Sequence, residues 1–140
     1  MRKIGSGAGL LLCSALAACG GGEPGEQAGG DQAQAALGGD GRLTIAMIAK
    51  SSTNPVFLSA RTGAEAAAAQ LSEARGVPIV VVWLTPPQED GQVQAQRITQ
   101  AVNEGADAIL LSASDPGKVT TAIRDAVSRG VAVMAFDTDV

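Results

Sequence analysis

Histidine and tyrosine are absent from the 140-residue chain, and aromatic residues make up only 2% of it. Without histidine, histidine-based catalysis and histidine metal ligation are excluded. So few aromatic rings do not favour a stacking platform for nucleic acid. The net charge of −4 points the same way, because duplex binding needs a basic face. What remains is a chain that is 46% hydrophobic, enough for one domain or one lobe of something larger.

Long hydrophobic runs are also scarce, and the first one lies at the N-terminus. Arg2 and Lys3 form a basic region, followed by the apolar run Ile4–Ala18. This run is too short to cross a bilayer comfortably, so residues 1–19 are predicted to be a signal peptide. A signal peptide implies an exported protein.

The signal ends in Leu-Ala-Ala-Cys, at Leu16–Cys19. This ending resembles the lipobox of bacterial lipoproteins, which implies that Cys19 becomes the first residue and carries diacylglycerol on its thiol. The alternative is an ordinary signal peptide with a chance cysteine. The chain has one other cysteine, within the signal, so no disulfide is expected. The Gly-rich residues 20–41 read as a flexible tether between the lipid and a folded domain at 42–140.

The folded part alternates apolar runs of strand length with segments of helical periodicity. The expected strands are Leu43–Ala49, Ile79–Leu84, Ala108–Ala113 and Val131–Phe136, and the expected helices are about Pro55–Ala74, Gly91–Glu104 and Pro116–Arg129. Continuous apolar strands are typical of a parallel sheet covered on both faces. The order predicts half of a doubly wound, Rossmann-like α/β fold with the first strand in a central position.

Polar segments follow all four expected strands, at the edge where ligands bind in such sheets. They are Lys50–Asn54, Thr85–Asp90, Ser112–Asp115 and Asp137–Asp139. This asymmetry between the two ends of the sheet predicts a small-molecule site at the carboxyl ends.

Individual residues of these segments allow more than one role. Asn54 is either a helix cap only or a ligand contact as well, while Asp115 is mainly a cap. Asp137 ends an apolar strand and could accept hydrogen bonds from ligand hydroxyls or amines. Its alternative role is a salt bridge with Lys50 across the strand ends.

Several segments resemble a known family. They are K-S-S-T-N-P-V-F after the first strand, then R-I-T-Q-A-V-N-E-G-A-D-A-I-L-L-S-A-S-D-P, and finally R-G-V-A-V-M-A-F-D-T-D-V. In this order and spacing they resemble the N-terminal lobe of periplasmic sugar-binding proteins of the ribose-binding type. That group shares its fold with the ligand cores of LacI-type repressors. The resemblance spans about Leu43 to Val140.

The resemblance implies the N-terminal lobe of a type I periplasmic-binding-protein fold. It also implies a substrate-binding lipoprotein of an ABC importer, whose two lobes close around a sugar and which works with an ABC permease. The implied ligand contacts are Lys50, Asn54, Phe57, Asp137 and Thr138; no cofactor is expected. Two positions depart from the family pattern: Val56 stands where pentose binders carry an aromatic residue, and Thr138 where many members carry arginine. The absent second lobe suggests a truncated chain.

Three other functions compete with import. An enzyme is not expected, because no G-x-G-x-x-G, P-loop or G-x-S-x-G motif follows the first strand. A sensory receptor on the same fold stays open as the alternative. A repressor is excluded by the export signal and by the absence of a helix-turn-helix segment.

Overall fold

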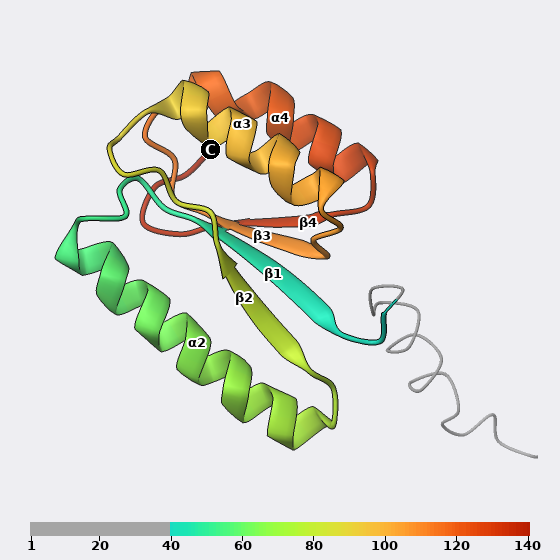
Figure 1. Cartoon of the computed structure of the whole chain (residues 1–140). Helices are drawn as coiled ribbons and strands as arrows, with labels where there is room; N and C mark the ends of the chain where they lie inside the picture. Colours follow the sequence, from blue (N-terminus) through green and yellow to red (C-terminus); the bar gives the residue numbers. More distant parts are fainter. Residues whose placement is uncertain (1–39) are drawn as a thin grey trace, which may run out of the picture.

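The computed structural model describes residues 40–140, which form one α/β layer structure (Figure 1). The signal peptide, Cys19 and all but the end of the tether lie outside the described residues. The elements are β1 (Leu43–Ile48), α2 (Pro55–Arg75), β2 (Ile79–Trp83), α3 (Gly91–Asn103), β3 (Ala108–Leu111), α4 (Pro116–Ser128) and β4 (Ala132–Ala135). The expected order of strands and helices is confirmed, with boundaries that differ by one or two residues.

The four strands form a parallel sheet in the order β2-β1-β3-β4. The predicted central position of β1 is therefore confirmed: Ala46 lies between Val82 of β2 and Ile109 of β3. The chain leaves β1 for one face of the sheet and leaves β2 and β3 for the other (Figure 1). The carboxyl ends of β1 and β3, which are neighbours, thus lead to opposite faces. This is the switch point at which doubly wound sheets bind ligands.

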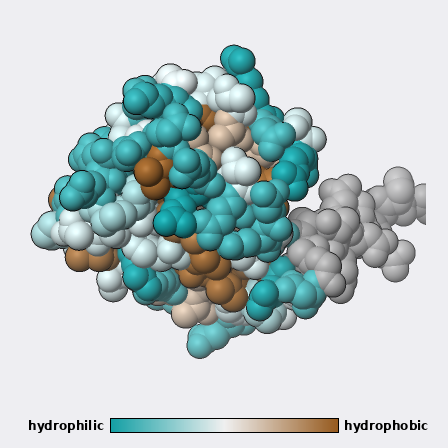
Figure 2. All heavy atoms as spheres, turned by 45° about the horizontal axis from the view of Figure 1, so that its top comes forward, coloured by the Kyte–Doolittle hydropathy of each residue, from teal (hydrophilic) through white to brown (hydrophobic). Residues whose placement is uncertain are grey.

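One face of the sheet is covered by α3 and α4, which lie side by side (Figure 1). The main core is here, built from Ile98 on α3, Val119 on α4 and Ile109 and Leu111 on β3, all fully buried. Seen from this side, the outer surface is mostly hydrophilic (Figure 2). Both helices are therefore amphipathic in the ordinary way, with an apolar stripe on the sheet.

Among the described residues the other face carries only α2, which packs on β2 (Figure 1). Within α2 only Phe57 and Ala68 are buried, and Leu71 is 45% exposed. Helices thus lie on both faces of the sheet, as the continuous apolar strands predicted, but within residues 40–140 the face under α2 is covered less completely. The apolar strands did suit burial on both faces, but a single helix is too narrow to cover four strands.

All three helices begin at a side-chain cap. Asn54 accepts a hydrogen bond from the Val56 N–H at 3.0 Å, and Asp90 and Asp115 cap α3 and α4 in the same way. The capping roles predicted for Asn54 and Asp115 are confirmed. Among residues 40–140, none of these helices is both long and apolar enough to cross a membrane.

Candidate functional site

The turns that follow β1 and β2 are bound to each other. Ser51 Oγ donates to the Pro87 carbonyl at 3.0 Å, and the Ser52 N–H donates to Pro86 at 2.7 Å. Thr85 Oγ1 accepts from the Ala49 N–H at 2.7 Å. Polar side chains of one turn thus satisfy the backbone of the other, which holds the start of α2 in place beside the carboxyl end of the sheet.

Asp137, just beyond β4, is the centre of a polar cluster at this edge. Its Oδ2 lies 2.9 Å from Lys50 Nζ, accepts from Ser112 Oγ at 2.9 Å and accepts from Thr138 Oγ1 at 3.2 Å. Three of the four strands therefore contribute a donor or acceptor within a few residues of their carboxyl ends. The salt bridge between Lys50 and Asp137, the alternative role predicted for this carboxylate, is present.

The three contacts of the Asp137 carboxylate all fall on one oxygen. Oδ1 accepts no hydrogen bond from residues 40–140, and the side chain is 45% exposed. The carboxylate is fixed through Oδ2, while Oδ1 keeps its acceptor capacity unused by residues 40–140. An ionised carboxylate oxygen is a strong acceptor for hydroxyl groups.

The pKa of Asp137 reflects this cluster. The hydrogen bond from Lys50 lowers the pKa of the carboxyl below its ordinary value of 3.8, and the bond from Ser112 acts in the same direction. The residue also has a left-handed backbone, with φ of 63°. Aspartate adopts this conformation more readily than most residues, although it still carries some strain. Asp137 is thus held both ionised and in a fixed direction.

Asn54 and Phe57, the other predicted ligand contacts, differ in how exposed they are and in whether their side chains have partners. Asn54 is half-buried, and capping uses only its Oδ1, so that its amide N–H groups are free of partners among the described residues. Phe57 is only 5% exposed and meets the Phe136 ring edge-on at 6.5 Å. A ligand could reach only a small part of this ring. Val56, beside it, is 65% exposed.

Two residues of this edge were not singled out from the sequence. Ser112 is fully buried and anchors Asp137, and Gln94 of α3 is fully buried next to it. Ser112 had a signal: it is the first polar residue after β3, on the same edge as Asp137. Gln94 had none, because a glutamine within a polar stretch of helix looks like a surface residue.

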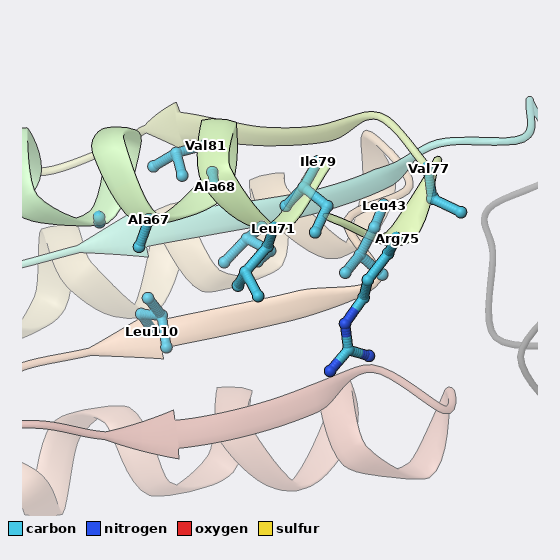
Figure 3. A pocket seen from close by; sticks show the side chains of 11 residues that line it. Leu43, Ala67, Ala68, Leu71, Arg75, Val77, Ile79, Val81 and Leu110 are labelled. Carbon is cyan, nitrogen blue, oxygen red and sulfur yellow. The ribbon is translucent and has the colours of Figure 1, made fainter. Parts of the chain in front are cut away.

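A large apolar cavity within residues 40–140 lies elsewhere. It is an apolar groove of about 750 Å³ between α2 and the sheet, shown in Figure 3. Its walls come from β1, β2, β3 and the second half of α2, with Leu71 over its centre and Arg75 at one end (Figure 3). Neither Lys50 nor Asp137 lines it. The groove lacks convergent polar groups, so its size does not make it the solute site.

Within residues 40–140 no group of three or more acidic, cysteine or histidine side chains is arranged to hold a metal ion. A fixed carboxylate, an amide and hydroxyl groups lie at the switch point of a parallel sheet, which is an arrangement typical of solute-binding α/β lobes.

Comparison with known proteins defines the family. Residues 45–140 match the family described as a periplasmic binding protein domain, and the chain belongs to this family. Its members are solute binders rather than enzymes, and membership implies an exported protein. The predicted α/β fold and the predicted family are both confirmed.

Individual relatives are similar over about 70% of the chain. The ribose import binding protein of Bacillus subtilis (strain 168) is 28% identical over 95 residues, which are 68% of this chain and 29% of that protein. LsrB from Clostridium saccharobutylicum, solved in complex with AI-2, is 33% identical with a TM-score of 0.61, over 70% of this chain and 28% of that one. A carbohydrate transporter from Acidothermus cellulolyticus 11B, solved with myo-inositol, is 28% identical with a TM-score of 0.55, over 71% and 32%. The chain spans about three tenths of the length of each.

Proposed function

We propose that the protein is the substrate-binding lipoprotein of an ABC importer and binds a sugar or a similar polyhydroxylated solute. The observation that carries the proposal is the Asp137 carboxylate, held on Oδ2 by three donors, with Oδ1 unused by residues 40–140. The names of the relatives support it, because they bind or import ribose, AI-2 and myo-inositol.

The cluster suits a neutral solute with several hydroxyl groups. Asp137 Oδ1 accepts a hydrogen bond from one hydroxyl, and the Asn54 amide donates to another. Lys50 balances the charge of Asp137, so the edge does not demand a cationic ligand. Thr138 and Phe57 support this site. Thr138 donates a hydrogen bond to the carboxylate, and the Phe57 ring packs edge-on against Phe136.

These residues form one wall of the proposed site. The solved relatives extend far beyond the matched part, and a polyol needs partners on more than one side. We therefore place the solute in a cleft between this lobe and a second one. An ABC permease is the proposed partner of the closed form.

The proposed lipid anchor rests on Leu16–Cys19 at the end of the signal peptide. Diacylglycerol on Cys19 would tether the lobe to the cell envelope. Cells grown with an alkyne fatty acid should yield labelled protein, and Cys19→Ser should abolish the label and release the protein from the membrane fraction. Unlabelled wild-type protein would contradict the anchor without affecting the solute proposal.

Solute binding is tested by calorimetric titration of the mature protein, which lacks only the signal peptide. The ligands are D-ribose, D-arabinose, D-allose, myo-inositol and AI-2, each also followed by the ligand-dependent rise in Tm. Asp137→Asn should weaken binding at least tenfold, since a charged hydrogen bond contributes about 1.5–3 kcal/mol. Asp139→Asn is the matched control: it is the same change two residues away, on a carboxylate with no ion pair among residues 40–140, and it should bind like the wild type.

Two results would overturn the proposal. The first is no heat and no Tm shift with any ligand of the panel. The second is equal affinity in Asp137→Asn and Asp139→Asn, which would move the site away from this edge.

A further inference from the structure

Gln94 of α3 is a polar side chain with no exposed surface. Its Nε2 donates to the Ala49 carbonyl at 2.9 Å and to the Ser112 carbonyl at 2.8 Å, and its Oε1 accepts from the Ser114 N–H at 2.8 Å. Both of its N–H groups and its oxygen are therefore in use. Each bond goes to the backbone of a residue just past a strand, and none goes to a residue of α3 itself.

These bonds lie where the β1–β3 ladder ends. The last ladder-like bond runs from the Ser112 N–H to the Ile48 carbonyl at 3.0 Å. Beyond it β1 leads to α2 on one face of the sheet and β3 leads to α4 on the other. The carbonyls of Ala49 and Ser112 then have no strand partner, and buried carbonyls need a donor. The two N–H groups of Gln94 supply one to each.

Ala49 and Ser112, whose carbonyls Gln94 binds, are also connected to the polar cluster around Asp137. Ala49 immediately precedes Lys50, and Ser112 is itself the residue whose hydroxyl donates to Asp137. A shift of either carbonyl would move Lys50 or Ser112 relative to Asp137. We propose that Gln94 is a positioning residue, which sets the separation of the turns after β1 and β3 and so holds Lys50 and Ser112 on Asp137 Oδ2.

Other side chains of similar size cannot repeat this arrangement. Methionine would fill the space but leave two buried carbonyls and one N–H without partners. Glutamate keeps the shape and can still accept from Ser114, but when ionised it places negative charge against two carbonyl oxygens. Gln94→Glu therefore replaces the NH₂ group that donates to the two carbonyls and changes the packing least.

The test measures the pKa of Asp137 in the full-length protein, by ¹³C NMR of its carboxyl group. The bonds from Lys50 and Ser112 hold this pKa below 3.8, so loosening them should raise it toward 3.8. We expect the rise in both Gln94→Met and Gln94→Glu, and in Gln94→Glu the charge of an ionised glutamate adds to it. Gln96→Met, an exposed glutamine on the same helix, should leave the pKa unchanged.

A second control separates positioning from stability. Ile98→Val removes one methyl group from a fully buried residue of the same helix that is no part of the cluster. It should lower Tm while leaving the Asp137 pKa at the wild-type value. If Gln94→Met is folded and keeps the wild-type pKa, Gln94 only fills the core and the proposal fails. If Gln94→Met does not fold, the same reading is taken from Gln94→Leu, which also removes the donors and adds no charge.

The functional meaning of this role rests on the proposed solute site, but the measurement needs no ligand. An unchanged Asp137 pKa in a protein that binds a sugar would overturn the positioning role alone. A raised pKa in a protein that binds no member of the sugar panel would overturn the proposed function alone.

Discussion

The two faces of the sheet are built from similar residues and are closed to different degrees. Under α3 and α4, side chains such as Ile98, Ile109 and Val119 are fully buried. Under α2, Leu71 remains 45% exposed above an apolar groove of about 750 Å³. An exposed apolar patch of this kind in a soluble protein usually marks a contact surface. The comparison shows that the buried apolar core of residues 40–140 lies mainly on one face, and we expect most of the stability to come from there.

The largest expected effect is on the closed face. Ile98→Ala should lower the free energy of unfolding by about 2–5 kcal/mol, because it removes a buried side chain and leaves a cavity. Urea denaturation of the full-length protein, followed by circular dichroism, measures the change. A loss below 1 kcal/mol would mean that this face can collapse around the gap, and the contrast between the faces would fail.

A smaller loss is expected where α3 and α4 meet. Gly91 is buried, and a Cβ there would lie 2.9 Å from the Cβ of Asp115 and 3.3 Å from that of Lys118. Gly91→Ala should therefore push the helix starts apart and cost about 1–3 kcal/mol, in spite of the better helix propensity of alanine. Gly63→Ala in α2 is the control, since nothing lies within 4 Å of its Cβ position. A stabilised Gly91→Ala protein would show that the closed face is looser than its burial indicates.

The open face should tolerate the same kind of deletion. Leu71→Ala removes a side chain of the same volume as Ile98 from a position that is half in solvent, so we expect a loss of about 1 kcal/mol or less. The same urea titration measures it. A loss equal to that of Ile98→Ala would show that the groove is covered in the full-length protein, and would remove the difference between the faces.

The sequence allowed the fold to be predicted further than the site. Apolar runs and caps such as Asn54 and Asp115 are local signals, and they located every strand and helix to within two residues. The uneven cover of the two faces is not local, since it depends on how many helices share each side. Lys50 and Asp137 were placed together because parallel strands end at one edge.

The direction in which a side chain points could not be predicted from these local sequence patterns. Phe57 stays a predicted ligand contact, and nothing in the sequence indicates that its ring packs against Phe136, a residue far away in the chain. Gln94 gave no sign of burial, because its partners are backbone groups of two distant turns. Both depend on tertiary contacts that a pattern of residue types does not encode.

The smallest expected effect concerns the edge where the two faces meet. Lys50 lies on the turn that leads from the central strand β1 to α2, and Asp137 follows the edge strand β4. Lys50→Met removes the first cause of the lowered Asp137 pKa. A carboxyl whose pKa is lower in the folded than in the unfolded protein stabilises the fold when it is ionised. The contribution of Asp137 is therefore fully present above about pH 3.8, its pKa in the unfolded chain, and is lost as the pH falls through its pKa in the folded protein.

Urea titrations of the wild type and Lys50→Met over the acidic range would measure this contribution. The wild type should be slightly more stable at neutral pH, and the difference should disappear below pH 3.8. Lys118→Met, at an exposed lysine without an ion pair among residues 40–140, should show no such convergence. The effect is small because both partners are partly exposed and solvent screens the pair. A constant difference at all pH values would mean that Lys50 acts through packing, and that the edge does not couple the two faces by charge.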